Sequence, residues 1–250
     1  KKITSIALSS ALLLGAAVTT SNADTISSAN FIQISGSDRI STSIELSKHS
    51  YPSTSSSVVI ASGELFPDAL AGGTLSAVVD GPLLLTKKDN LPSNVKAELD
   101  RLKPKSIYIL GGKNTISSNV EKQIKDTFDN VYRIDGTDRY ETSIKIAEKV
   151  RSMAKDSKKT VFVNGINFAD ALSAGALGAK LKAPLILTNG KNLPSSVEKV
   201  ADKNDKANNI IVGGQNSVNI SDLMAERVSG ADRYETSANL ANKYFAKAEN

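Results

Sequence analysis

The sequence predicts an α/β protein built from tandem repeats of a doubly wound, mostly parallel sheet with helices on both faces, in Rossmann-like or flavodoxin-like units. Short apolar runs alternate with amphipathic or Ala/Gly-rich segments, which is the pattern of strands alternating with helices. The same ordered motifs occur twice, 100 to 102 residues apart, and begin a third time. This period is too long for a solenoid, so each copy should be a lobe with its own core.

The first 23 residues have the layout of a secretory signal peptide. Lys1 and Lys2 give a positive start, residues 6–18 form an apolar run, and residues 21–23 resemble a cleavage site. The alternative is a membrane anchor, but the run is shorter than the roughly 20 residues that a span needs. We therefore expect export and no membrane span after removal of the signal. Because the first residue is not Met, we also expect a longer gene product.

The second copy gives the clearest signals, and it opens with a short strand at 131–135. Asp138 then stands at an N-cap position with Glu141 three residues later, which is a capping-box arrangement. This arrangement predicts a helix over 138–150. A short β-branched and aromatic run at 160–163 predicts the next strand, buried in the core.

The second half of the copy continues the alternation. Residues 170–181 are dense in Ala and Gly, which suits a helix packed closely on a sheet. Residues 184–187 form a continuous apolar run, as expected of a strand covered on both faces. Ser195 should cap a further helix with Glu198 as its third residue, and 209–212 should be the last strand. We expect the strands of one copy to form one parallel sheet.

Composition excludes several kinds of site. The chain has no cysteine, so disulfides and Cys-based nucleophiles or metal sites are excluded. His49 is the single histidine, and Lys149 replaces it in the second copy, which argues against Ser-His pairs and the common zinc sites. Residues 111–115 resemble the end of a phosphate loop, but Gln215 replaces Lys113 in the second copy. We expect no catalytic residue, no metal and no cofactor.

The net charge of the chain is mildly positive. Removal of residues 1–23 takes away two lysines and no acid, so the formal charge falls from +5 to +3. The charges are interspersed, which fits weak attraction to an anionic polymer but is also common for solvated surfaces. Aromatic and basic residues do not interleave, so nucleic acid is not an expected partner.

Polar residues follow the predicted strands at the points where the strands end. Asp138 and Arg139 follow the first strand of the second copy, residues 167–170 follow the second, and Thr188 ends the third. The glycines at 213–214 follow the fourth. Parallel sheets bind ligands beyond the carboxyl ends of their strands, so we expect the ligand site at this edge.

Two sets of charged residues have both a chemical and a structural interpretation. Asp68 and Asp170 could flank a sugar and cleave a glycosidic bond. Each also opens a predicted helix, where a carboxylate caps free amides, and we favour this interpretation. Arg39, Arg139 and Arg233 each follow an Asp. They either bind a ligand carboxylate or phosphate or form a salt bridge within the protein.

The motifs of the repeat resemble those of the cell-wall-binding repeat type 2 family of surface and S-layer-associated proteins from clostridia and related Gram-positive bacteria. The resemblance covers residues 31–250. The shared motifs are Gly-x-Asp-Arg at 36–39, 136–139 and 230–233, Phe-x-Asp-Ala-Leu at 66–70 and 168–172, Pro-Leu-(Leu/Ile)-Leu-Thr at 82–86 and 184–188, and Gly-Gly at 111–112 and 213–214.

The resemblance implies non-covalent anchoring to an anionic secondary cell-wall polymer, with three repeats associated in one unit. It also implies that a polymer-binding role falls on residues 82–85 and 184–187, which are otherwise most simply core strands. The polymer-binding candidates are Asp38, Arg39, Asp68, Pro82, Leu83, Leu84, Leu85, Thr86, Asp138, Arg139, Asp170, Pro184, Leu185, Ile186, Leu187, Thr188 and Arg233.

We place the first repeat at 31–128, the second at 129–225 and the start of a truncated third repeat at 226–250. The third copy lacks the Phe-x-Asp-Ala-Leu and Pro-Leu motifs, so we expect the chain to be the N-terminal portion of a longer protein. The absence of a catalytic set favours a secreted wall-binding module. The alternatives are a cell-wall hydrolase of the amidase or glycosidase kind and a structural component that associates with other surface-layer proteins.

Overall fold

The computed structural model describes residues 32–245, so the predicted signal peptide at 1–23 lies outside the described residues. The described chain folds into two lobes, each with a four-stranded sheet. The sheet orders are β2-β1-β3-β4 and β6-β5-β7-β8, and all neighbouring strands are parallel. The predicted α/β class with parallel sheets is therefore confirmed.

The first lobe alternates helices and strands throughout. Its elements are α1 (Arg39–Ser50), β1 (Ser57–Ser62), α2 (Pro67–Val79), β2 (Leu83–Thr86), α3 (Ser93–Leu102), β3 (Ser106–Leu110), α4 (Ser118–Lys125) and β4 (Val131–Ile134). The second lobe begins in the same way but contains fewer helices. Its elements are α5 (Arg139–Met153), β5 (Thr160–Asn164), α6 (Phe168–Leu181), β6 (Leu185–Thr188), the short 3₁₀ helix η1 (Val197–Lys199), β7 (Asn209–Val212), β8 (Glu226–Val228) and α7 (Arg233–Tyr244).

The strand at the start of the second copy belongs to the first sheet. β4 pairs with β3 in parallel, with Ile107 opposite Val131 and Leu110 opposite Ile134. Our expectation that this strand shares a sheet with the other strands of its copy is therefore wrong. A short connection through α4 places β4 beside β3, since consecutive strands usually pair. β8 completes the second sheet in the same way, by pairing with β7.

The prediction of a helix that starts at Ser195 is also wrong. Only the three-residue helix η1 forms there, and Ser196 precedes it without a side-chain cap. Asp202 and Asp205 accept hydrogen bonds from the backbone amides of Asn204 (2.9 Å) and Asn208 (3.2 Å). Such local side-chain bonds stabilise turns at the expense of a helix.

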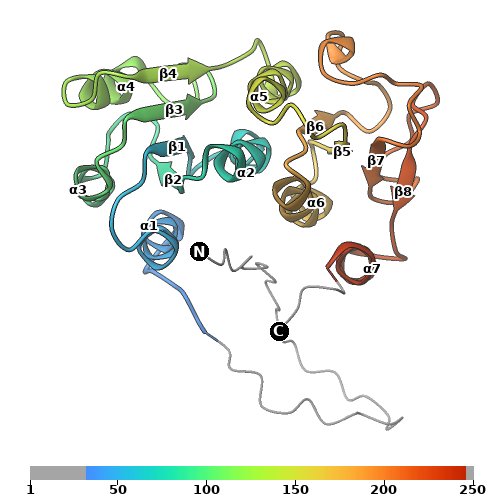
Figure 1. Cartoon of the computed structure of the whole chain (residues 1–250), viewed down its shortest axis with the longest axis horizontal. Helices are drawn as coiled ribbons and strands as arrows, with labels where there is room; N and C mark the ends of the chain where they lie inside the picture. The colour runs from blue at the N-terminus through green and yellow to red at the C-terminus, as the bar shows by residue number, and fades with distance from the viewer. Residues whose placement is uncertain (1–31, 246–250) are drawn as a thin grey trace, which may run out of the picture.

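The two lobes pack against each other through α2, α5 and α6, which lie between the sheets (Figure 1). The rings of Phe66 and Phe168 meet edge to face at 5.7 Å between centroids. Each lobe has its own apolar core, and a further cluster joins Val59 and Leu75 of the first lobe to Ile146 of α5. The expectation of one core per copy therefore describes only part of the packing.

Between residues 32 and 245, no helix has both the length and the apolar character that crossing a membrane requires.

Candidate functional site

The aspartate of each Gly-x-Asp-Arg motif is a helix N-cap. Asp38 accepts a hydrogen bond from Ser41 N at 2.7 Å, and this bond is the main reason why its pKa is lowered. Asp138 accepts from Tyr140 N and Glu141 N, both at 2.8 Å. The predicted cap at Asp138 is confirmed. These carboxylates satisfy amides that would otherwise be free at the start of a helix.

The arginines of the motif contact backbone rather than carboxylates. Arg39 Nη1 donates to the carbonyl of Gly63 at 2.7 Å, and Arg139 Nη1 donates to that of Gly165 at 2.9 Å. Each bond ties the start of a helix to the loop that follows the first or the fifth strand. Among residues 32–245, no salt bridge forms at these arginines or at Arg233, which is exposed. The predicted salt-bridge alternative is therefore not what the structure shows.

Asp68 and Asp170 do not cap their helices. The N-cap positions of α2 and α6 are Phe66 and Asn167, and neither makes a side-chain cap bond. Our favoured interpretation of these aspartates as caps is therefore wrong. Asp68 lies at the second position of α2, inside the first turn, where a carboxylate is still favoured by the helix dipole.

Each of these aspartates lies against the first glycine of a Gly-Gly pair. A β-carbon at Gly111 would lie 2.2 Å from Asp68 Oδ2, and one at Gly213 would lie 2.7 Å from Asp170 Oδ2. Both glycines also have positive φ, +96° and +119°, which other residues rarely adopt. Burial raises the pKa of Asp68 to about 6, and Arg139 partly opposes this rise. The repeated Phe-x-Asp and Gly-Gly motifs therefore form one packing contact in each lobe.

The Pro-Leu runs lie mostly in the interior. Pro82, Leu84 and Thr86 are buried around β2, and the whole of Pro184–Thr188 is buried around β6, while Leu83 and Leu85 are half-buried. The buried side chains are not exposed to a polymer at the surface of this structure. Their polymer-binding role stays a prediction. The buried side chains could serve it only indirectly, by holding the strand and the loop after it in place.

Helices cover these two strands, which lie at the edges of their sheets. Ser43 Oγ of α1 accepts a hydrogen bond from Leu85 N at 3.1 Å, and Ser143 Oγ of α5 accepts one from Leu187 N at 3.0 Å. An uncovered edge strand exposes unpaired amides that favour aggregation. In the first two copies, the serine that ends the Asp-Arg-x-x-Thr-Ser motif therefore protects the edge of a sheet.

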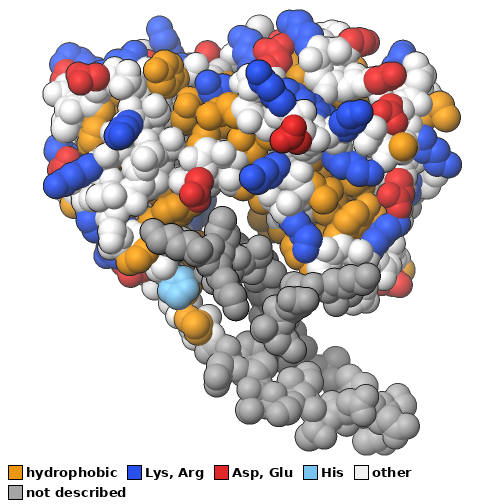
Figure 2. Space-filling view, in the orientation of Figure 1, with side chains coloured by type: hydrophobic (Ala, Val, Ile, Leu, Met, Phe, Trp, Pro, Cys, Tyr) orange, Lys and Arg blue, Asp and Glu red, His pale blue; other side chains and the backbone are white. Residues whose placement is uncertain are grey.

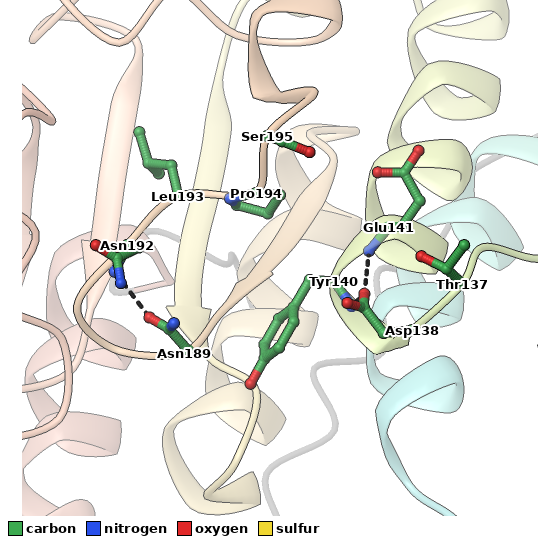
Figure 3. A pocket seen from close by; sticks show the side chains of 9 residues that line it. All are labelled: Thr137, Asp138, Tyr140, Glu141, Asn189, Asn192, Leu193, Pro194 and Ser195. Carbon is green, nitrogen blue, oxygen red and sulfur yellow. Dashed lines mark hydrogen bonds between the residues drawn. The ribbon is translucent and has the colours of Figure 1, made fainter.

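A surface hollow of about 130 Å³ lies at the carboxyl end of β6 (Figure 3). One wall is the start of α5 and the other is the loop after β6. It is lined by Thr137, Asp138, Tyr140, Glu141, Asn189, Asn192, Leu193, Pro194 and Ser195. The predicted ligand edge therefore contains a hollow in the second lobe.

The hollow joins some predicted site residues to others that sequence reasoning missed. Of the predicted residues, Asp138 lines it, and Thr188 is buried at the end of the strand below it. Neither Asp170 nor any residue of the runs at 82–86 and 184–188 lines it. Asn189 and Asn192 were missed, although two asparagines within five residues of the end of a predicted strand are a signal for a structured polar loop.

The loop of the hollow is ordered by its own side chains. Asn189 Oδ1 accepts from Lys191 N at 2.9 Å and from Asn192 N at 2.7 Å. Ser196 Oγ donates to Glu141 Oε2 at 2.6 Å, which connects the loop to α5. Over the described residues, no group of three or more His, Cys, Asp or Glu is placed to hold a metal ion.

The sequence model of the cell wall binding domain 2 (CWB2) family matches two segments of this chain, residues 33–121 and 133–221. The chain belongs to the CWB2 family. Each matched segment covers most of one lobe, so the chain carries two CWB2 domains, as in cell-surface proteins. The family resemblance stated from the motifs is thereby confirmed.

Curated relatives and solved structures agree with this CWB2 assignment. The chain is 32% identical over 215 residues to the N-acetylmuramoyl-L-alanine amidase LytC of Bacillus subtilis, a match that covers 84% of this chain and 42% of LytC. It is 29% identical to the amidase enhancer of the same organism, in a match that covers 87% of this chain and 30% of the enhancer. The structure of Cwp6 from Clostridium difficile has a TM-score of 0.77 at 31% identity, with 91% of this chain and 39% of Cwp6 covered. Cwp8 from the same organism has a TM-score of 0.76 at 32% identity, and the match covers 84% of this chain and 37% of Cwp8.

The CWB2 chain thus spans less than half of each of these relatives. More than half of LytC lies outside the match, so the name of LytC describes a longer protein. The residues matched here are wall-binding domains.

Proposed function

We propose that this chain anchors an exported protein non-covalently to the Gram-positive cell wall, by binding an anionic secondary wall polymer at the carboxyl edges of its two sheets. The CWB2 domains and the likeness to Cwp6 and Cwp8 support wall attachment. The anionic polymer is the finer part of the proposal, and it depends on the charges at these edges.

One observation carries the anionic part. Lys87 directly follows β2, is exposed, and lies near enough to Asp38 to add to the lowering of its pKa, after the larger effect of the Ser41 hydrogen bonds. Lys88 is next to it. The carboxyl edge of the first lobe therefore offers cations to a phosphate or carboxylate group. Elsewhere, positive and negative side chains are interspersed over the face shown in Figure 2.

Two edges in one chain suit a repetitive ligand. Each edge contact can be weak, because binding of the second lobe to a linked polymer segment becomes intramolecular. A contact between exposed charges is screened by salt, so attachment should weaken as ionic strength rises.

Retention on purified walls tests this proposal. The expected result is retention that falls with added salt and that is weaker for Lys87→Gln than for the wild type. Lys105→Gln is the matched control, because Lys105 is exposed at the opposite, amino end of β3. If retention is insensitive to salt and equal for all three proteins, the anionic polymer is not the ligand of this edge.

A wall hydrolase is the alternative that one observation favours, the amidase name of LytC. Release of muropeptides from walls by this chain alone would support it. We expect no release, because the hollow in the second lobe holds no histidine or cysteine and the two repeated aspartates pack against glycines.

A further inference from the structure

The hollow of the second lobe has two walls that are far apart in the sequence and joined by Glu141. The third copy carries the same Asp-Arg-Tyr-Glu sequence, and there Glu235 Oε2 accepts from its own neighbour Ala231 N at 2.7 Å. Glu141 instead accepts from Ser196 Oγ, on the opposite wall, at 2.6 Å. The hydrogen bond holds the carboxylate of Glu141 at the hollow rather than at its own helix turn.

The lining of the hollow combines hydrogen-bonding groups with apolar surface. The side-chain amide of Asn192 supplies donors and an acceptor, the NH₂ group of Asn189 supplies donors because its oxygen already accepts two backbone bonds, and Asp138 and Glu141 supply acceptors. Tyr140 and the Leu193–Pro194 pair add an aromatic ring and aliphatic carbons, and Tyr140 lies between the two walls in Figure 3. This combination matches a sugar ring, which has hydroxyls at its rim and C–H groups on its faces.

The same lining disfavours an anion. It contains two carboxylates and no Lys or Arg. The start of a helix attracts anions, but Asp138 already accepts from two of the free amides of α5, those of Tyr140 and Glu141. A phosphate group placed here would meet like charges at short range.

Most positions of this lining carry the same or a similar residue in the first lobe, but three differ in chemistry. Ile40, Ser41 and Lys87 stand where the second lobe has Tyr140, Glu141 and Asn189. Relative to the second lobe, the first lobe therefore lacks the carboxylate and the aromatic ring and gains a cation at these positions. The lobes are therefore not two copies of one binding site.

We propose that the hollow of the second lobe binds a neutral, hydroxyl-rich sugar residue of the wall polymer, while the lysine edge of the first lobe takes its anionic group. This inference rests on the proposed function. The volume of about 130 Å³ is below the roughly 300–1,000 Å³ of pockets that enclose a drug-sized ligand, so the hollow suits one residue of a longer chain.

Titration followed by amide NMR tests the inference. The probes are the neutral saccharide fraction obtained by acid extraction and dephosphorylation of purified walls, and inorganic phosphate as the anion. The neutral fraction should shift the signals of residues 138–141 and 189–195 saturably, and phosphate should not. Glu141→Ser, which installs the residue of the first lobe, should bind about tenfold more weakly, as expected for one lost hydrogen bond to a charged group.

Two further variants keep the test decisive. Glu235→Ser changes the same motif position in α7, away from the hollow, and should bind like the wild type. Asn192→Ala removes an exposed side chain whose own atoms make no hydrogen bond within residues 32–245, so it should fold normally and yet bind the neutral fraction more weakly.

Shifts caused by phosphate alone, or unchanged binding of the neutral fraction by Glu141→Ser and Asn192→Ala, would overturn the inference. A chain that is retained on walls but shows no shift with the neutral fraction also overturns it, and leaves anchoring intact. Shifts at the hollow without retention on walls support the sugar site and contradict anchoring.

Discussion

The repeated Asp-Arg pair organises a helix start in each of the first two copies. The aspartate caps the helix, and the arginine reaches the carbonyl of a loop glycine, Gly63 or Gly165. Gly136 then donates its N–H to Thr142 Oγ1 at 3.0 Å, which closes the turn. Much of what repeats in the sequence therefore secures the fold, and repetition alone does not mark ligand contacts.

Replacement of Arg139 tests this structural role. Arg139→Ala should lower the free energy of unfolding by about 1 kcal/mol, because the carbonyl of Gly165 loses its side-chain donor. Arg233→Ala is the matched control, since Arg233 is exposed and its side chain makes no hydrogen bond within residues 32–245. Urea denaturation measures both. Equal effects of the two substitutions would contradict the assigned contact.

Asp68 should make stability depend on pH. Its pKa is about 6 in the folded chain, against an ordinary value of 3.8, because it is buried. The folded state therefore binds more protons between these values, and the free energy of unfolding falls as pH rises from about 4 to about 6. Asp68→Asn should be more stable than the wild type at pH 7, by roughly 2–3 kcal/mol, and nearly equal to it at pH 4.

Denaturation of both proteins at several pH values checks this difference. A stability difference between wild type and Asp68→Asn that is the same at pH 4 and pH 7 would show that the carboxyl is not held in a buried, desolvated state.

At the scale of elements, the two lobes differ in the segments after β2 and β6. The first lobe has the regular helices α3 and α4, with Val95, Leu99 and Leu102 of α3 fully buried. The second lobe has only η1 and turns in the corresponding segments. Backbone amides without regular helical hydrogen bonds open more easily.

Hydrogen exchange should therefore separate the lobes. Residues 193–208 and 214–225 should exchange faster than α3 and α4, while β5 and β7 should be protected like β1 and β3. Exchange followed by mass spectrometry resolves these segments. Equal protection of 193–208 and α3 would mean that the second lobe is as regular as the first.

The sequence allowed the alternation of strands and helices to be predicted, but not which sheet each strand joins. The apolar pattern of β4 is the same whether its neighbour is β3 or β5, because periodicity reports burial and not the pairing partner. The failed helix at Ser195 has a similar cause. Val197 and Val200 fit a helical stripe, but the turn-forming Asp202 and Asp205 decide the local structure.

The hollow lies at the edge of the sheet where the sequence predicts a ligand site, but few of its lining residues are among the predicted ones. Asp138 was identified through its cap position, while Tyr140 and Glu141 were read only as helix residues. Their approach to Asn189 and Asn192 depends on the fold, since some 50 residues separate the two walls. A polymer-binding role for the Pro-Leu runs was implied only by the family resemblance. The runs are largely buried because α1 and α5 cover the edge strands β2 and β6.

Over the whole molecule, the two lobes meet through closely packed helices. A β-carbon at Gly178 of α6 would lie 2.5 Å from Thr74 Cγ2 of α2, whereas one at Gly175 would have its nearest neighbour, Leu70 O, at 3.8 Å. The small residue at 178 therefore lets the two helices approach, and the one at 175 is not required for that.

Two alanine substitutions test the interface between the lobes. Gly178→Ala should destabilise the chain by roughly 1–3 kcal/mol through overpacking. Gly175→Ala should stabilise it by up to about 1 kcal/mol, because alanine favours a helix more than glycine does. Urea denaturation gives the free energy of unfolding of each variant, and therefore the direction of each change relative to the wild type. Stabilisation by both substitutions would show that α2 and α6 are not in tight contact.

The central claim is that the two lobes attach the chain to a secondary polymer of the wall. The most direct measurement compares retention of the chain on purified walls before and after acid extraction of secondary polymers. We predict strong retention on intact walls and little on extracted walls. Undiminished retention on extracted walls would contradict the claim and point to peptidoglycan itself as the ligand.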